Sequence, residues 1–173
     1  MIEVWLRGPL EGIDPYLMPA AHALTQAREE LAIAVDGLTA NDLWQRPGGV
    51  AAIGFHLRHL VGSTDRLLSY ARGEMLTDAQ MAFIRSEGEP GDPGVGVAEL
   101  LGGAQAAIDG ALAQIAATPR ESLLEAREVG RKRIPSTTIG LLFHVAEHAA
   151  RHVGQVVTTA KIIRAGRAAE PLG

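Results

Sequence analysis

The apolar pattern of residues 136–165 constrains the fold of this chain more than any other stretch. At about 100° per residue, its apolar side chains spread over one broad arc of an α-helix. The members of this arc are Leu141, Val145, Ala149, Val153, Val156, Val157, Ala160 and Ile163. Pro135 precedes the stretch, and Ser136 or Thr137 can cap its first turn. We therefore expect a long amphipathic helix that ends near Ala165.

Three histidines lie four residues apart within this helix, at His144, His148 and His152. Each step of four residues advances about 6 Å and turns only about 40°, so the imidazoles form a gently winding row. His152 falls inside the apolar arc and His148 on its edge, whereas His144 lies beyond the edge beside Glu147 and Arg151. Two neighbours in such a row can bind one metal ion. The alternative is a half-buried row that is hydrogen-bonded to other helices.

Three further stretches have the periodicity of amphipathic helices, at about residues 16–37, 50–72 and 97–117. No stretch has the pattern of a convincing strand, and the polar residues 120–135 carry no clear pattern of either kind. The sequence thus predicts an all-α four-helix bundle, where metal sites arise from side chains on facing helices. A loop rich in proline and glycine, residues 86–96, separates the second and third helices and is long enough to be functional.

Two shorter helical segments are expected between the long helices. Thr39 to Asp42 resembles a capping box, which predicts a single turn that holds Leu43 and Trp44 against the core. Residues 77–84 predict a second short helix.

At 173 residues, the chain is expected to be one domain with a core of its own. Residues 1–15 are interrupted by proline and glycine, which predicts an arm anchored by Trp5 or Leu6. Residues 166–173 are expected to be a frayed tail.

Composition excludes several classes of function. The chain has no cysteine, which rules out disulfides, thiolate metal sites and a cysteine nucleophile, and fits a reducing cytoplasm. The N-terminus lacks a secretory signal, and no stretch of about twenty apolar residues is free of charges, so a membrane partner is not expected. The net charge of −4 and the short basic run at residues 127–133 disfavour nucleic-acid binding.

The second predicted helix carries two more histidines, His56 and His59, three residues apart and therefore neighbours on one side. His56 lies closer to the apolar arc, whereas His59 shares its flank with Ser63 and Arg66. Burial alone would select His56 as a partner for the histidine row. A metal ligand should instead face the cavity at the centre line of the bundle, and this favours His59.

Two motifs in these helices resemble the DinB/YfiT-like family of metal-dependent four-helix proteins. Residues 53–68, IGFHLRHLVGSTDRLL, are similar to the family segment whose key histidine falls here on His59. Residues 148–155, HAARHVGQ, resemble the family pattern H-x-x-x-H-x-G-Q. The positions of that pattern fall on His148, His152, Gly154 and Gln155. Upstream, LTANDLWQRP resembles the family's link between its first two helices.

The resemblance implies a left-handed bundle of up-down-down-up topology, with one divalent metal held by His59, His148 and His152. We expect zinc or nickel. It also implies a homodimer and, for some members, the transfer or isomerisation of a small substrate with a low-molecular-weight thiol. His56 and His144 would then support the ligands or pack against other helices. Arg66 or Arg151 could hold an anionic substrate.

Two hypotheses for function follow. In the first, the protein is a metal-dependent enzyme, because three neutral imidazoles leave coordination positions open for water or substrate. No catalytic side chain is identified by the sequence. In the second, the protein is a non-catalytic, stress-associated dimeric scaffold whose metal site is structural or vestigial. A di-iron carboxylate site is less well supported, since the second and fourth predicted helices contain no Glu-x-x-His motif.

Overall fold

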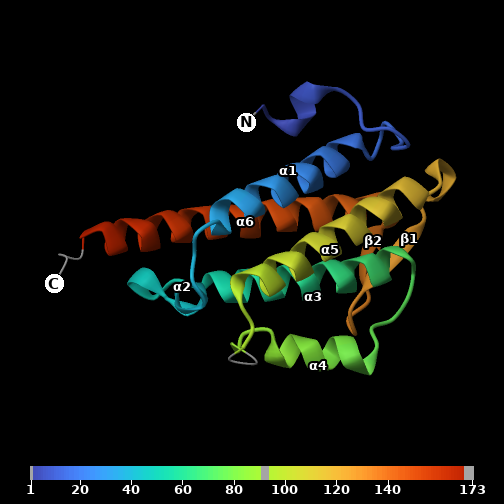
Figure 1. Ribbon diagram of the computed structural model, residues 1–173. Coiled ribbons are helices and arrows are strands. Elements are labelled where there is room, and N and C mark those ends of the chain that lie inside the picture. The colour runs from blue at the N-terminus through green and yellow to red at the C-terminus, as the bar shows by residue number, and fades with distance from the viewer. Residues whose placement is uncertain (1, 91–93, 170–173) are drawn as a thin grey trace.

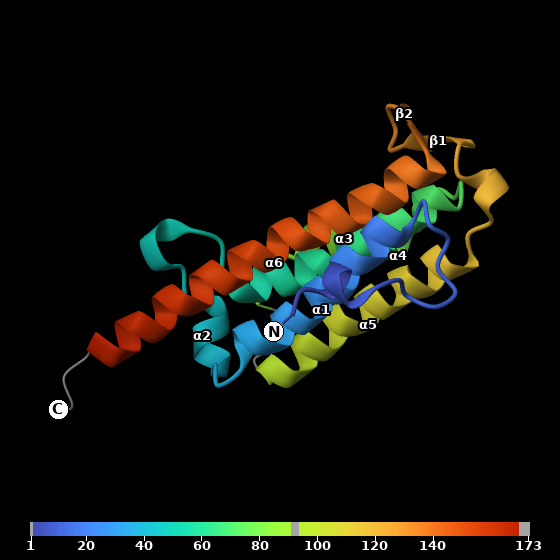
Figure 2. The same ribbon diagram turned by 90° about the horizontal axis from the view of Figure 1, so that it is seen from above.

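Four long helices form from the four amphipathic stretches that the sequence predicts (Figure 1). Their bounds are Met18–Val35 for α1, Ile53–Ala71 for α3, Val97–Ala117 for α5 and Thr138–Ala169 for α6. This computed structural model describes residues 2–90 and 94–169. α1 and α3 each pack against both α5 and α6. The four helices run alongside one another in two perpendicular views (Figures 1 and 2).

The core lies between these four helices because each presents one apolar face to the others. The predicted arc of α6 is buried, apart from Val157, which is half-buried. On α3, Leu57 and Leu60 are at most 1% exposed. Burial of such side chains is the main favourable contribution to folding, at about 25 cal/mol for each Å² of apolar surface. In the part of the chain that the structure describes, no helix is both long and apolar enough to cross a membrane.

Glycines follow the ends of two long helices. Gly37 follows α1 and Gly73 follows α3, and both have positive φ angles, of 68° and 78°. A residue without a Cβ atom adopts this left-handed conformation at little cost. Pro19 lies in the first turn of α1, where its missing N–H leaves no helical hydrogen bond unmade.

The predicted turn after α1 is confirmed as α2 (Ala40–Trp44). Thr39 Oγ1 accepts a hydrogen bond from the backbone N–H of Asp42, and the Asp42 carboxylate accepts one from the backbone N–H of Thr39. Leu43 is fully buried. Asp42 is only 2% exposed and pairs with Arg167 of α6 at 2.9 Å, so this turn also holds the end of the longest helix.

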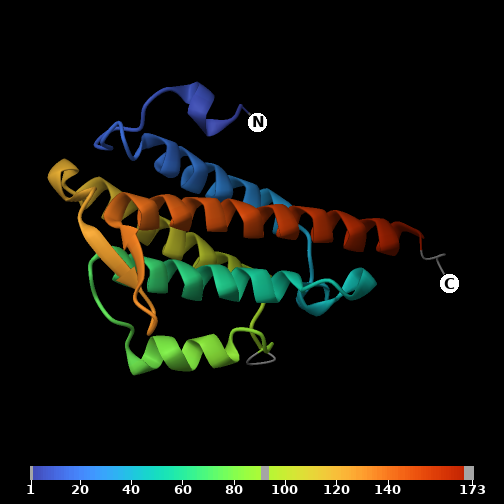
Figure 3. The ribbon, with the colours of Figure 1, turned by 180° about the vertical axis from the view of Figure 1, so that it is seen from behind.

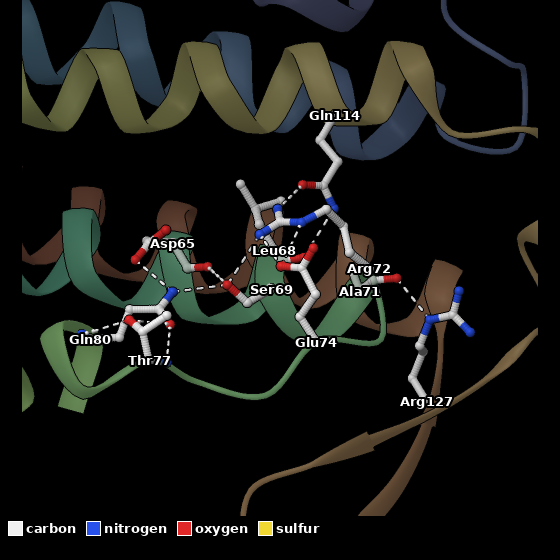
Figure 4. Close-up of polar contacts among 10 residues, drawn as sticks. All are labelled: Asp65, Leu68, Ser69, Ala71, Arg72, Glu74, Thr77, Gln80, Gln114 and Arg127. Carbon is white, nitrogen blue, oxygen red and sulfur yellow. Dashed lines mark hydrogen bonds and ion pairs between the residues drawn. The ribbon is translucent and has the colours of Figure 1, made fainter.

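The second predicted short helix is confirmed as α4 (Asp78–Ser86), which packs against α3 (Figure 4). Its first turn is attached through Gln80, whose side-chain nitrogen donates to Asp65 Oδ2 at 2.8 Å and to Ser69 Oγ at 2.9 Å. No residue within α4 is buried. The hydrogen bonds of Gln80 therefore help to hold α4 against α3.

A β-hairpin forms where no strand was expected, and that expectation was wrong. Strand β1 (Ala126–Val129) pairs antiparallel with β2 (Ile134–Thr137) just before α6 (Figure 3). The turn between them places Gly130 and Arg133 at positive φ. Arg127 Nε also donates to the carbonyl of Ala71 at the end of α3. Both strands have only four residues, too few for a strand pattern to emerge from their sequence.

The N-terminal residues pack on α1, but through a different side chain than predicted. Val4, in the 3₁₀ turn Val4–Arg7, is 1% exposed, whereas Trp5 and Leu6 are 61% and 58% exposed. Val4 N–H donates to Gln26 on α1 at 2.9 Å. The expected anchor was therefore wrong, because the turn directs Val4 and not its two larger neighbours toward α1.

Helix α6 (Thr138–Ala169) continues four residues beyond its expected end, up to the last described residue. Residues 166–169 are thus helical and not a frayed tail. The rest of the expected tail, residues 170–173, lies outside the described residues.

Candidate metal centre

Packing of α3 against α6 brings histidines from both helices to one place. His59, His148 and His152 each offer one ring nitrogen, and the three nitrogens lie within 4.8 Å of one another. His59 Nε2 and His148 Nε2 are 3.0 Å apart. The rings of His148 and His152 have centroids 4.5 Å apart. No carboxylate among the described residues belongs to this group.

The three imidazoles fit a divalent metal ion. Two nitrogens bound tetrahedrally to one zinc, each at about 2.0–2.1 Å, would lie about 3.3 Å from each other, close to the 3.0 Å between His59 Nε2 and His148 Nε2. The nitrogens that converge, among them His59 Nε2 and His148 Nε2, have no carboxylate of the described residues between them and are the groups that a bound cation would satisfy.

The second ring nitrogen of His59, Nδ1, contacts Glu87, a residue that the sequence did not single out. His59 Nδ1 lies 2.8 Å from Glu87 Oε1, and Glu87 Oε2 lies 3.1 Å from Arg66 Nη1. A carboxylate can only accept hydrogen bonds, so Nδ1 of His59 is the protonated nitrogen. In the neutral ring, Nε2 then keeps its lone pair for a metal.

The other histidine of α3, His56, contacts His152. Their Nδ1 atoms are 2.8 Å apart, which requires one ring to donate and the other to accept. His56 is 6% exposed, in agreement with its predicted place near the apolar arc. His59 and not His56 thus joins the three-residue group. The roles of these side chains as ligands stay a prediction.

The environment favours the neutral form of His152, His148 and His56. Burial, followed by the repulsion of His148, His59 and His56, lowers the pKa of His152 to about 3. Burial and the neighbouring His59 and His144 also lower the pKa of His148. Burial is the main cause of the lowered pKa of His56. Neutral imidazole is the form that binds a metal, so the lowered pKa values of His148 and His152 favour metal binding by these two rings.

The remaining predicted site residues lie around this group. His144 is exposed, as expected, and its Nδ1 is 3.3 Å from Glu147 Oε2. Arg151 pairs with the same carboxylate, and its hydrogen bond lowers the pKa of Glu147. Arg66 pairs with Glu87. Both candidate substrate-binding arginines therefore already contact carboxylates, and a substrate role for either stays a prediction.

Phe55 forms one wall of the cluster. Its ring stacks on His59 with centroids 5.4 Å apart and meets His56 edge-on at 5.3 Å. The same residue lines a cavity of about 490 Å³, together with Trp44, Arg46 and Pro90 among others. The loop after α4 therefore borders a cavity beside the histidines, and only residues 91–93 of the loop lie outside the described residues.

Comparisons with known proteins identify the family and the fold. A family model described as the DinB superfamily matches residues 23–156. The fold is similar to a crystal structure of a Streptococcus pneumoniae protein from a structural-genomics consortium, with a TM-score of 0.64 and 14% identity over 94% of this chain and 97% of that one. No curated protein sequence matches the chain. The family match includes α3 and the part of α6 that carries the histidine cluster, and the chain belongs to the DinB superfamily.

Proposed function

We propose that this protein is a divalent-metal-dependent enzyme, with zinc or nickel held by His59, His148 and His152. The observation that carries the proposal is the convergence of three half-buried ring nitrogens from α3 and α6 within 4.8 Å. No fourth protein ligand joins them among the described residues. A site of three ligands leaves a position for a substrate atom, which distinguishes catalytic zinc sites from closed structural ones.

The chain's own residues would bind and orient both the ion and the substrate. Glu87 contacts the second ring nitrogen of His59, and His56 contacts that of His152. Phe55 stacks on His59 and also lines the neighbouring cavity. That cavity, of about 490 Å³, is large enough for a small molecule. When bound, a divalent ion supplies Lewis acidity that lowers the pKa of a thiol or water. We propose a small substrate that is transferred or isomerised with a low-molecular-weight thiol, as the family resemblance implies.

The same resemblance supports proposals about architecture and assembly. We propose that α1, α3, α5 and α6 form the up-down-down-up four-helix bundle of DinB proteins, in one domain over residues 1–173 with residues 1–15 as an arm. The packing of α1 and α3 against both α5 and α6 supports this arrangement. We further propose a homodimer in the cytoplasm.

Metal analysis of protein expressed without an affinity tag tests the proposal. We expect about one equivalent of zinc or nickel per chain, retained through gel filtration. Less than about a tenth of an equivalent, even after zinc is added, would contradict a metal-dependent function and favour a scaffold with a vestigial site.

A further inference from the structure

We propose that Glu87 is a positioning residue of the metal centre, and that α4 is part of the site although it carries no ligand. Glu87 holds His59 with Nε2 turned toward the ion. The inference rests on the proposed metal site and adds to it a side chain from outside the two ligand-bearing helices.

Glu87 is the first residue after α4, and its place there is unusual for a carboxylate. It is 8% exposed, whereas no residue within α4 is buried. Burying a carboxylate is costly unless both oxygens find partners. Both do, since Oε1 meets His59 Nδ1 at 2.8 Å and Oε2 meets Arg66 Nη1 at 3.1 Å. The carboxylate is therefore fixed between an imidazole and a guanidinium group.

This contact selects the tautomer that a metal requires. A hydrogen bond from Nδ1–H to a carboxylate keeps the ring hydrogen on the outer nitrogen and leaves Nε2 free. His59 Nε2 is the atom that faces His148 Nε2. The carboxylate also makes the ring a better donor to a cation. Removing such a partner typically weakens metal binding about 10–100-fold.

The docking of α4 places Glu87 with precision, and one glycine of α3 makes the docking possible. A Cβ atom on Gly62 would lie 2.6 Å from Phe83 Cδ1 of α4 and 2.7 Å from Arg66 Nη1. Only a residue without a side chain admits both groups. Arg58 completes the attachment, as its Nη2 donates to the carbonyl of Ser86 at 2.9 Å and its guanidinium lies over the Phe83 ring.

Zinc affinity, measured by competition with a chelator, tests the proposal on three proteins. These are the wild type, Glu87→Gln, and Asp78→Asn as a control, which makes the same charge change at an exposed position at the other end of α4. We expect Glu87→Gln to weaken zinc binding at least about tenfold and Asp78→Asn to change it less than about twofold. Equal affinity of Glu87→Gln and wild type would overturn the role of Glu87 and leave the proposed metal site standing. A wild type that binds no zinc would overturn both.

A second measurement separates positioning from a general effect on folding. In the metal-free protein, ¹⁵N NMR of the imidazole nitrogens reports which nitrogen carries the hydrogen. We expect the Nδ1–H form for His59 in the wild type and in Asp78→Asn, and a mixture of both forms in Glu87→Ala. The same form in all three proteins, each with native helix content, would contradict the proposal.

Discussion

His59 Nε2 lies 3.0 Å from His148 Nε2, across the interface between α3 and α6. At this distance two neutral rings can share one hydrogen, but two charged rings would repel each other strongly. The same pair of nitrogens would serve equally well as two ligands of one cation. The contact thus links helix packing to the proposed chemistry, since any shift of α3 along α6 would alter both.

His152→Ala should abolish tight zinc binding, because it removes one of three ligands. We expect affinity to fall more than about 100-fold, beyond the effect of losing a supporting contact. His144→Ala is the matched control, as His144 lies in the same row but is exposed and outside the cluster. Isothermal titration of both variants with zinc would check this. Similar losses in the two variants would show that the row is used differently.

Gly62→Ala should destabilise the docking of α4. The added methyl group meets Phe83 and Arg66 at under 3 Å, so we expect a loss of about 1–3 kcal/mol in the free energy of unfolding and weaker zinc binding. Gly102→Ala is the control, because Gly102 lies within α5 and nothing approaches its Cβ position within 4 Å. That change should be neutral or stabilise the protein by up to about 1 kcal/mol. Urea unfolding would measure both, and equal effects would refute the close packing at Gly62.

Asp42→Asn should destabilise the protein at pH 7 but not in acid. Burial raises the pKa of Asp42, but hydrogen bonds from Thr39 and the charges of Arg167 and Arg164 outweigh it and lower the pKa overall. The unfolded state therefore binds its proton first as pH falls. The stabilisation is present above the unfolded pKa of about 3.9 and disappears as pH falls through the folded pKa.

We expect Asp42→Asn to reduce the free energy of unfolding by about 0.5–2 kcal/mol at pH 7, because the neutral amide weakens the charged hydrogen bonds from Thr39 and Arg167. The difference from wild type should shrink as pH falls below about 4. Unfolding with urea at pH 7, 5 and 3 would follow it. A difference that stays constant over this range would contradict an ionised Asp42 as the source of stability.

The local sequence pattern was sufficient to predict features that depend on one helix alone. The apolar arc of α6 follows from the 3.6-residue period alone, and so does the different burial of His144 and His152. The choice between His56 and His59 needed one further step, the idea that a ligand faces the centre line between helices. The structure groups His59 with His148 and His152 and pairs His56 with His152, while the role of His59 as a ligand stays a prediction.

Features that depend on tertiary contacts could not be predicted in this way. Glu87 meets His59 only because α4 folds back on α3, and the two residues are 28 positions apart. The hairpin likewise depends on its turn and on the contact between Arg127 and the end of α3. The stacking of Phe55 on His59 is different, because the two residues are four positions apart on α3 and their contact follows from helical spacing alone.

The crystal structure of zinc-loaded protein soaked with a small thiol tests the central claim most directly. We predict one zinc bonded to ring nitrogens of His59, His148 and His152 at about 2.0–2.1 Å, with the thiol sulfur as fourth ligand at about 2.3 Å. Zinc at another location, or a fourth protein side chain that fills the open position and excludes the thiol, would contradict the account. The latter result would indicate a structural site and a non-catalytic protein.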